Sequence, residues 1–233
     1  MKVELISWTK DPIKTVEKAA AQCYASEPSL KVVKHCIKSN HLSILEQCNF
    51  TFEIQGVSRA LLAQLTRHRT GSYSVRSQRY TNEGNFDYYT PNSIKYGPPT
   101  VQKLYDDTME FLKDVYSKLI AEGIKQEDAR NVLPNACCTN LVMTFDLRNL
   151  GHFCNERLCY RSQNEINQLA KQIKKAIFDK KDEMGLNNEE LELINSFLVP
   201  KCEVDGVNYC REERGCGLHP QLEQILKDKN GEK

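Results

Sequence analysis

The sequence predicts an α+β fold, a helix-rich single domain with a small, largely antiparallel sheet. Apolar residues recur at every third or fourth position over most of its length, which is typical of helices with one buried face. Strict alternation of apolar and polar residues, which is typical of half-buried strands, is confined to a few short segments. These segments are not followed regularly by crossover helices, so a doubly wound parallel sheet is not expected.

Start signals and apolar stripes predict the first helices. Asp11 followed by Pro12 is a typical helix start, and Ser29 opens a second short helix. The segment SRALLAQLTRHR (58–69) is predicted to be helical throughout, because its leucines can face a core.

A longer helix is predicted from Val101 to a stop at Gly123, the usual place for a glycine after a helix end. Its predicted apolar face consists of Leu104, Tyr105, Thr108, Phe111, Leu112, Val115 and Leu119. A short helix around Asp128 follows, and then two helices from about Arg148 and Glu165. The last of these is predicted to bury Ile166, Leu169, Ile173 and Ile177.

Strands are predicted where apolar residues alternate with polar ones. The segment NFTFEI places Phe50, Phe52 and Ile54 on one face. The segment TNLVMTFDL does the same with Leu141, Met143 and Phe145. A third segment, FDYYT (86–90), is also strand-like.

Composition limits the classes of function. The 233 residues include 32 basic and 31 acidic ones, a formal net charge of +1, so a general nucleic-acid coat is not expected. The N-terminus reaches charged residues too early for a signal peptide, and no apolar run approaches the roughly 20 residues that span a bilayer. We therefore expect a cytoplasmic protein with no membrane partner and no nucleic-acid partner.

Residues 67–80, RHRTGSYSVRSQRY, are locally basic within this neutral chain. They include four arginines and a histidine without one carboxylate, and Gln64, Arg67 and His68 are spaced to share one helix face. Guanidinium groups bind phosphate through paired, charge-assisted hydrogen bonds, so the stretch suits a phosphorylated small molecule. The alternative is a surface loop whose arginines pair with acids elsewhere in the chain.

The same stretch resembles the signature of the flavin-dependent thymidylate synthases. The family pattern Arg-His-Arg-x-x-Ser-x-Asn-x-x-Ser-x-Arg-Tyr is matched at all positions but one, where Ser74 replaces Asn. The segments HLSILEQCNFTFEI, ARNVLP and LRNLGHFCNERL are also similar to the family, so the resemblance covers about residues 35–170. The surface-loop alternative is therefore disfavoured.

The resemblance implies an enzyme, a methyltransferase that converts dUMP to dTMP. In this family methylenetetrahydrofolate supplies the one-carbon unit, FAD supplies the hydride, and NADPH usually reduces the flavin. The resemblance also implies a homotetramer. The alternative is a non-catalytic nucleotide- or RNA-binding module in which Arg69, Arg76, Arg79 and Tyr73 or Tyr80 form a surface for cation and stacking contacts.

The resemblance also assigns roles to individual residues. The dUMP-binding residues would be Gln64, Arg67, Ser77, Gln78, Arg79, Arg130 and Arg157. The FAD-binding residues would be His41, Ser43, Arg67, His68, Arg69, Asp146, Arg148 and His152. Arg157 would be the catalytic residue, because a fixed cation at the uracil ring stabilises negative charge on N3 and O2 and makes C5 nucleophilic. The chain has no segment like the nucleophilic Pro-Cys-His-Gln of the other thymidylate synthase class.

The chain departs from the family pattern at several positions near these residues. Val75 stands where many members have Glu, Gln78 stands where Gly is frequent, and Asp146 stands where Asn is frequent. An added negative charge at Asp146 is expected to alter the affinity for the cofactor.

The C-terminal residues 201–233 form a Cys-rich tail after a predicted synthase-like domain of residues 1–200. Cys202, Cys210, Cys216 and His219 could form a tetrahedral zinc site. Their spacing lacks the usual Cys-x-x-Cys pair, so a loose tail with unpaired thiols or an opportunistic disulfide is the more ordinary interpretation. No metal is therefore predicted, and the zinc site stays open as an alternative.

Overall fold

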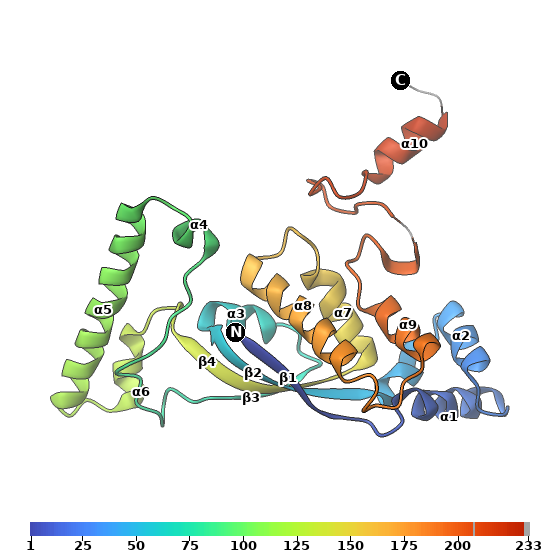
Figure 1. Cartoon of the computed structure of the whole chain (residues 1–233), viewed down its shortest axis with the longest axis horizontal. Helices are drawn as coiled ribbons and strands as arrows, with labels where there is room; N and C mark the ends of the chain where they lie inside the picture. Colours follow the sequence, from blue (N-terminus) through green and yellow to red (C-terminus); the bar gives the residue numbers. More distant parts are fainter. Residues whose placement is uncertain (207, 231–233) are drawn as a thin grey trace. The chain divides into compact units, whose positions relative to one another are not determined.

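The computed structural model describes residues 1–206 and 208–230 (Figure 1). It confirms the predicted class, because helices dominate and a single four-stranded antiparallel sheet has the strand order β1-β2-β4-β3. The strands are β1 (Lys2–Trp8), β2 (Asn49–Ser58), β3 (Ser72–Val75) and β4 (Cys138–Asp146). Within the described residues, no helix is long and apolar enough to cross a membrane.

The chain divides into two compact units. One contains residues 1–2, 53–69 and 73–143, and its helices are α3 (Arg59–Leu65), α4 (Asn92–Lys95), α5 (Pro99–Ala121), α6 (Gln126–Ala129) and the 3₁₀ helix η2 (Arg130–Val132). The other contains residues 3–52, 70–72 and 144–233. Its helices are α1 (Pro12–Tyr24), α2 (Leu30–Lys38), η1 (Leu42–Gln47), α7 (Leu147–Arg157), α8 (Asn164–Asp179), α9 (Asn188–Phe197), η3 (Val204–Gly206) and α10 (Leu222–Asn230).

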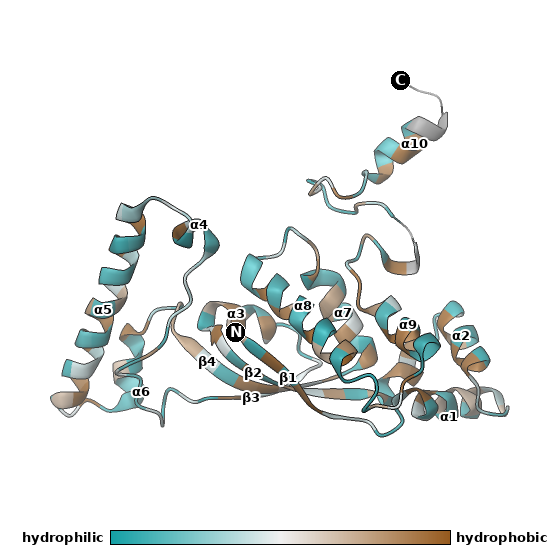
Figure 2. Ribbon diagram, in the orientation of Figure 1, coloured by the Kyte–Doolittle hydropathy of each residue, from teal (hydrophilic) through white to brown (hydrophobic). Residues whose placement is uncertain are grey.

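The predicted strand faces are buried. Phe50, Phe52 and Ile54 of β2 are fully buried, and the alternating residues Leu141, Met143 and Phe145 of β4 are at most 3% exposed. A side-chain hydrogen bond of 2.9 Å joins Thr51 of β2 to Thr144 of β4. In Figure 2 apolar residues appear as brown segments of the strands.

The helices around Arg148 and Glu165 are also confirmed. In α8 the residues Ile166, Leu169, Ile173 and Ile177 are all buried, which is the predicted stripe. Helix α7 packs against η1, α8 and α9. Helix α9 begins with a capping box, in which Asn187 accepts from the Glu190 amide and the Glu190 side chain accepts from the Asn187 amide.

The structure corrects several predicted elements. The helix predicted over 58–69 ends at Leu65, and FDYYT contributes one isolated bridge, between Tyr88 and Cys137, instead of a strand. In α5 the buried residues are Met109 and Tyr116, whereas Leu104 and Phe111 of the predicted apolar face are 69% and 63% exposed. Strand β1 and helices α9 and α10 were not predicted.

The predicted division at residue 200 stays a prediction, because the two compact units do not test it. The predicted tail includes residue 207 and residues 231–233, which lie outside the described residues.

Candidate functional site

The Arg-rich stretch leaves α3 through a tight turn. The Tyr73 hydroxyl donates to the backbone oxygens of Leu65, at 3.0 Å, and of His68, at 2.8 Å. Burial raises the pKa of Tyr73 to about 12, so its hydroxyl remains a donor at neutral pH. His68 is 9% exposed while Arg67 and Arg69 are exposed. The prediction that Gln64, Arg67 and His68 share one helix face is therefore wrong. Helix α3 ends at Leu65, before Arg67 and His68.

The arginines of this stretch differ in their partners. Arg76 lies 3.4 Å from the buried carboxylate of Glu83, and Arg79 lies 2.6 Å from Glu127. Within the described part of the chain, Arg67 and Arg69 form no ion pair. Arg76 and Arg79 thus pair with acids elsewhere in the chain, as the surface-loop interpretation expects. The exposed guanidinium groups of Arg67 and Arg69 have no carboxylate partner among the described residues.

Arg79 and Arg130, which the family resemblance assigns to dUMP and specifically to its phosphate, both form a hydrogen bond with one residue. Nε of Arg79 donates to Oε2 of Glu127 at 2.6 Å, and Nε of Arg130 donates to the Glu127 backbone oxygen at 3.1 Å. The hydrogen bond and charge of Arg79 lower the pKa of Glu127 from its usual value. Arg79 also lines an open cleft of about 470 Å³ with Tyr80, Lys125 and Glu127, within the range of ligand sites.

Ser77 and Gln78 lie between Arg76 and Arg79 in the sequence. The Ser77 hydroxyl oxygen accepts from the Arg79 amide at 3.2 Å, which shapes the turn. Gln78 donates to the Cys137 sulfur at 3.4 Å. Burial raises the pKa of the Cys137 thiol to about 11. The thiol beside a predicted dUMP-binding residue is therefore protonated at neutral pH.

In the other unit, η1 and α7 bring together five residues predicted to bind FAD. His41 precedes η1, Ser43 lies in it, Asp146 precedes α7, and Arg148 and His152 lie one turn apart on the exposed face of α7. Nη1 of Arg148 lies 2.5 Å from Oε1 of Glu46, which belongs to η1. A 2.9 Å hydrogen bond joins the Tyr24 hydroxyl to Nδ1 of His41. Glu46 and Tyr24 were not among the predicted site residues.

Asp146 has a structural function at the start of α7. Its side chain accepts from the Asn149 amide at 2.9 Å and from the Asn149 side-chain nitrogen at 2.6 Å, so it is the N-cap of the helix. Burial, together with the negative charge of Asp146, raises the pKa of Cys48 to about 12. The backbone oxygen of Cys48 accepts from the Leu147 amide at 2.7 Å, so this thiol is adjacent to the helix start.

Arg157, the predicted catalytic residue, is half-buried in the last turn of α7. A cation at this end is favoured by the partial negative charge of the helix terminus. The Asn167 side chain donates to the Arg157 backbone oxygen at 2.8 Å and to the Cys159 backbone oxygen at 3.3 Å. The segment that carries Arg157 is therefore held by a buried polar residue of α8.

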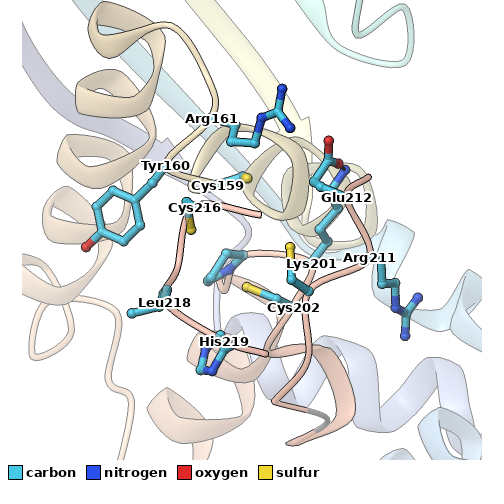
Figure 3. A pocket seen from close by; sticks show the side chains of 12 residues that line it. Cys159, Tyr160, Arg161, Lys201, Cys202, Arg211, Glu212, Cys216, Leu218 and His219 are labelled. Atoms are coloured by element: carbon cyan, nitrogen blue, oxygen red, sulfur yellow. Dashed lines mark ion pairs between the residues drawn. The ribbon is translucent and has the colours of Figure 1, made fainter. Parts of the chain in front are cut away.

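The Cys-rich tail forms a small cavity with the segment after α7 (Figure 3). Ligand-type atoms of Cys202, Glu203 and His219 lie within 4.8 Å of one another. The cavity, of about 10 Å³, is also lined by Cys159, Cys210 and Cys216. Burial is the main cause that raises the pKa of Cys202 above its usual value. The four tail residues suggested by the sequence thus line one cavity. Cys159 lines it too, and Glu203 lies beside His219, although the sequence suggested neither of these two residues.

The fold is that of the flavin-dependent class of thymidylate synthases. Thymidylate synthase X from Helicobacter pylori, crystallised with FAD and dUMP, is 24% identical, with a TM-score of 0.65 over 85% of this chain and 99% of that chain. A UMP/dUMP methylase from Streptomyces cacaoi bound with 5-Br dUMP is 26% identical, with a TM-score of 0.65 over 76% of this chain and 90% of that chain.

Sequence comparison agrees with the fold. Flavin-dependent thymidylate synthases from Geobacter sulfurreducens and Nitratidesulfovibrio vulgaris are 38% and 34% identical. The first match covers 73% of this chain and 79% of the relative, and the second covers 94% and 95%. The family model of the thymidylate synthase complementing protein (Thy1) matches residues 4–181. The chain belongs to this family of flavin-dependent thymidylate synthases, an enzyme family, and its Cys-rich tail lies beyond the residues that the family model matches.

Proposed function

We propose that this protein catalyses the reductive methylation of dUMP to dTMP, with methylenetetrahydrofolate as the one-carbon donor and NADPH as the reductant of its flavin. Its membership of the flavin-dependent thymidylate synthase family, over three quarters of its length, carries this proposal. A homotetrameric assembly and a cytoplasmic location are part of the same proposal.

The phosphate of dUMP binds to Arg79 and Arg130. Their contacts with Glu127 support this assignment, since Arg79 donates to the carboxylate and Arg130 to the backbone oxygen of the same residue, and guanidinium groups that lie near one residue can approach one phosphate. Glu127 occupies Nε of Arg79, which leaves the terminal nitrogens of that guanidinium for a ligand. Arg67 adds a further cation, and Gln64, Ser77 and Gln78 add neutral donors.

Arg157 activates the uracil ring. A guanidinium group does not deprotonate, so it presents a fixed positive charge to the negative charge that develops on N3 and O2. Two features of the structure support this role: the half-burial of Arg157, which limits screening by water, and the hydrogen bond that holds its peptide to Asn167.

No thiol attacks the ring in this proposal. The pKa values of Cys48 and Cys154 are raised to about 12 and that of Cys137 to about 11, in each case mainly by burial. Such thiols are protonated at neutral pH and are weak nucleophiles. Activation of C5 by a fixed cation therefore does not need them.

FAD binds to the surface formed by η1 and the exposed face of α7. Arg148 and His152 supply donors for its phosphates, and His41 and Ser43 reach the same surface from η1. This donor set fits an anionic dinucleotide in a chain without the glycine-rich phosphate loop of the usual dinucleotide fold. Arg67, His68 and Arg69 are assigned to FAD by the family resemblance alone. The bound flavin supplies the hydride that reduces the transferred carbon.

The test is an assay for dTMP with dUMP, methylenetetrahydrofolate, FAD and NADPH, and with flavin omitted as the control. We expect dTMP only in the complete mixture. Nucleotide or RNA binding without dTMP would instead support the non-catalytic module.

The role of Arg157 is tested in the same assay. Arg157→Ala should lower kcat by roughly 10²- to 10³-fold, the usual effect of removing one electrostatic stabiliser. Arg157→Lys should recover part of that loss, because it restores the charge without the planar group. The control is Arg211→Ala, which removes an exposed arginine that has no part in the proposed reaction. Near-normal turnover of Arg157→Ala would contradict its role.

A further inference from the structure

We propose that the cavity between the Cys-rich tail and the segment after α7 is a structural zinc site, with Cys159, Cys202, Cys210 and His219 as its ligands. The proposal is independent of the proposed function, because it concerns residues that bind neither substrate nor flavin.

Cys202 and His219 lie close enough to share one metal ion. Ligand-type atoms of Cys202 and His219 already lie within 4.8 Å of each other. Ligand atoms around a tetrahedral zinc lie roughly 3.5 Å apart, given the usual metal–ligand distances. A shift of about 1 Å thus brings these two atoms to a common ion. The cavity volume of about 10 Å³ is enough for one small species and too little for an organic ligand.

Two further cysteines can supply the remaining ligands. Cys159 and Cys210 line the same cavity as Cys202 and His219. Figure 3 shows Cys159 reaching this space from the segment after α7, so the ligands come from two separate parts of the chain. Three sulfurs and one imidazole nitrogen are a set that zinc prefers, whereas calcium and magnesium prefer oxygen.

Glu203 supports His219 as a ligand. Its carboxylate oxygen lies 3.3 Å from Nε2 of His219. Metal-binding histidines commonly donate their second ring nitrogen to a carboxylate, which fixes the ring and leaves the other nitrogen for the metal. We therefore assign Nδ1 of His219 to the zinc and Nε2 to Glu203.

The described residues of the tail have few apolar contacts that could stabilise their conformation. Among the described residues of 201–221, the only buried apolar side chains are those of Cys202 and Cys210. The regular structure there consists of the short η3 and one isolated bridge between Cys210 and Gln221. The other contacts are polar, such as the ion pair of Lys201 with Glu212 and the hydrogen bond from Arg161 to the Arg214 backbone oxygen. Small modules without an apolar core generally depend on a metal or on disulfides.

The experiment measures zinc in the full-length protein, purified under reducing conditions without chelators. We expect about one zinc per chain by elemental analysis. Replacement of the zinc by Co²⁺ should give the absorption bands of tetrahedral cobalt with sulfur-to-metal charge transfer. A zinc-free preparation with fully reduced thiols would overturn the proposal, and so would a disulfide between any two of the assigned cysteines in the native protein.

Variants test the ligand set. Cys202→Ser and Cys159→Ser should each lose zinc, and Cys159→Ser is the sharper test because it changes no residue of the tail. Cys23→Ser is the matched control, because Cys23 is exposed on α1 outside the cluster. Cys216→Ser should keep its zinc, since Cys216 is exposed at the cavity wall.

The cobalt spectrum of the unmodified protein remains decisive if a variant does not fold. Loss of zinc from Cys216→Ser would overturn the assignment of the fourth ligand to His219, and equal loss from Cys23→Ser would overturn the site itself.

Discussion

Nε of Arg79 lies 2.6 Å from a carboxylate oxygen of Glu127, within a stretch whose sequence contains no acid between Ile54 and Asn82. The partner comes from α6, far along the chain, and the same residue accepts from Arg130 through its backbone oxygen. Glu127 therefore both aligns the two arginines and competes with any anionic ligand for one of them.

Neutralising Glu127 tests this competition. Glu127→Gln keeps the side-chain shape and an acceptor for Arg79, but it removes the negative charge beside the proposed phosphate position. We expect the KM for dUMP to fall about threefold, with kcat nearly unchanged, which is the scale of an exposed charge interaction. The measurement is initial-rate kinetics at low and at high salt, because screening should shrink the difference.

Glu122→Gln is a suitable control for that variant, since Glu122 lies at the other end of the same connection and outside the cleft. A higher KM in Glu127→Gln would mean that alignment of Arg79 matters more than competition.

The titration of Glu127 gives a pH-dependent prediction. Arg79 stabilises the ionised carboxylate through a hydrogen bond and its charge, so the pKa of Glu127 is lowered from its usual value in the folded protein. The ion pair is therefore present at neutral pH and is lost as the pH falls through the lowered pKa. Carbon-detected NMR titration should show the Glu127 midpoint shifting upward in Arg79→Ala. An unchanged midpoint would mean that the pair does not form in solution.

The buried thiols give a prediction about chemical modification. With a pKa of about 11, Cys137 is ionised in roughly one molecule in a thousand at pH 8, and Cys48, with a pKa of about 12, is ionised less still. Iodoacetamide at pH 8 should therefore modify the exposed Cys23 of the folded protein and leave Cys48 and Cys137 intact by mass spectrometry. All of them should react in urea. Loss of dTMP formation in parallel with alkylation of Cys137 would contradict the proposal that no thiol attacks the ring.

The sequence predicted the fold best where one face of an element is buried. Phe50, Phe52 and Ile54 alternate because β2 has one core face, and the stripe of α8 follows the same logic with the helical period. Strand β1 was not predicted, because only Leu5 of its seven residues is buried and the alternation is therefore weak. The error in α5 has a similar cause, since this helix carries apolar residues on more than one face and only packing selects the buried one.

The residues of the candidate site were assigned from the sequence, but the contacts between their side chains and other residues were not predicted. The resemblance assigned both Arg79 and Arg130 to dUMP, but only the folded chain brings Glu127, a near neighbour of Arg130 in sequence, to Arg79. Glu46 was visible as part of the family-like segment, yet nothing in the sequence linked it to Arg148. The tail cysteines were recognised as a cluster, whereas Cys159 joins them through tertiary structure alone. Contacts between distant segments carry no local sequence signal, so patterns of spacing cannot supply them.

The carboxylate of Asp146 can affect both the stability of α7 and the binding of FAD. Its carboxylate caps α7 through the Asn149 amide, and it also places a negative charge near residues of the proposed flavin surface. Asparagine is also a good N-cap, whereas alanine is not, and loss of a cap costs about 1 kcal/mol. Asp146→Ala should therefore lower the midpoint of thermal unfolding by roughly 2–4 °C, and Asp146→Asn should leave it nearly unchanged.

The affinity for FAD should respond differently from the stability. Asp146→Asn removes the charge while it keeps the helix start that positions Arg148 and His152, so FAD should bind more tightly than to the unmodified protein, by a few-fold as measured from flavin fluorescence. Asp146→Ala removes the same charge but frays the first turn of α7, and its affinity should lie below that of Asp146→Asn. Equal affinity of the unmodified protein and Asp146→Asn would mean that the carboxylate is neutralised by its cap contacts and that this departure from the family pattern serves the helix alone.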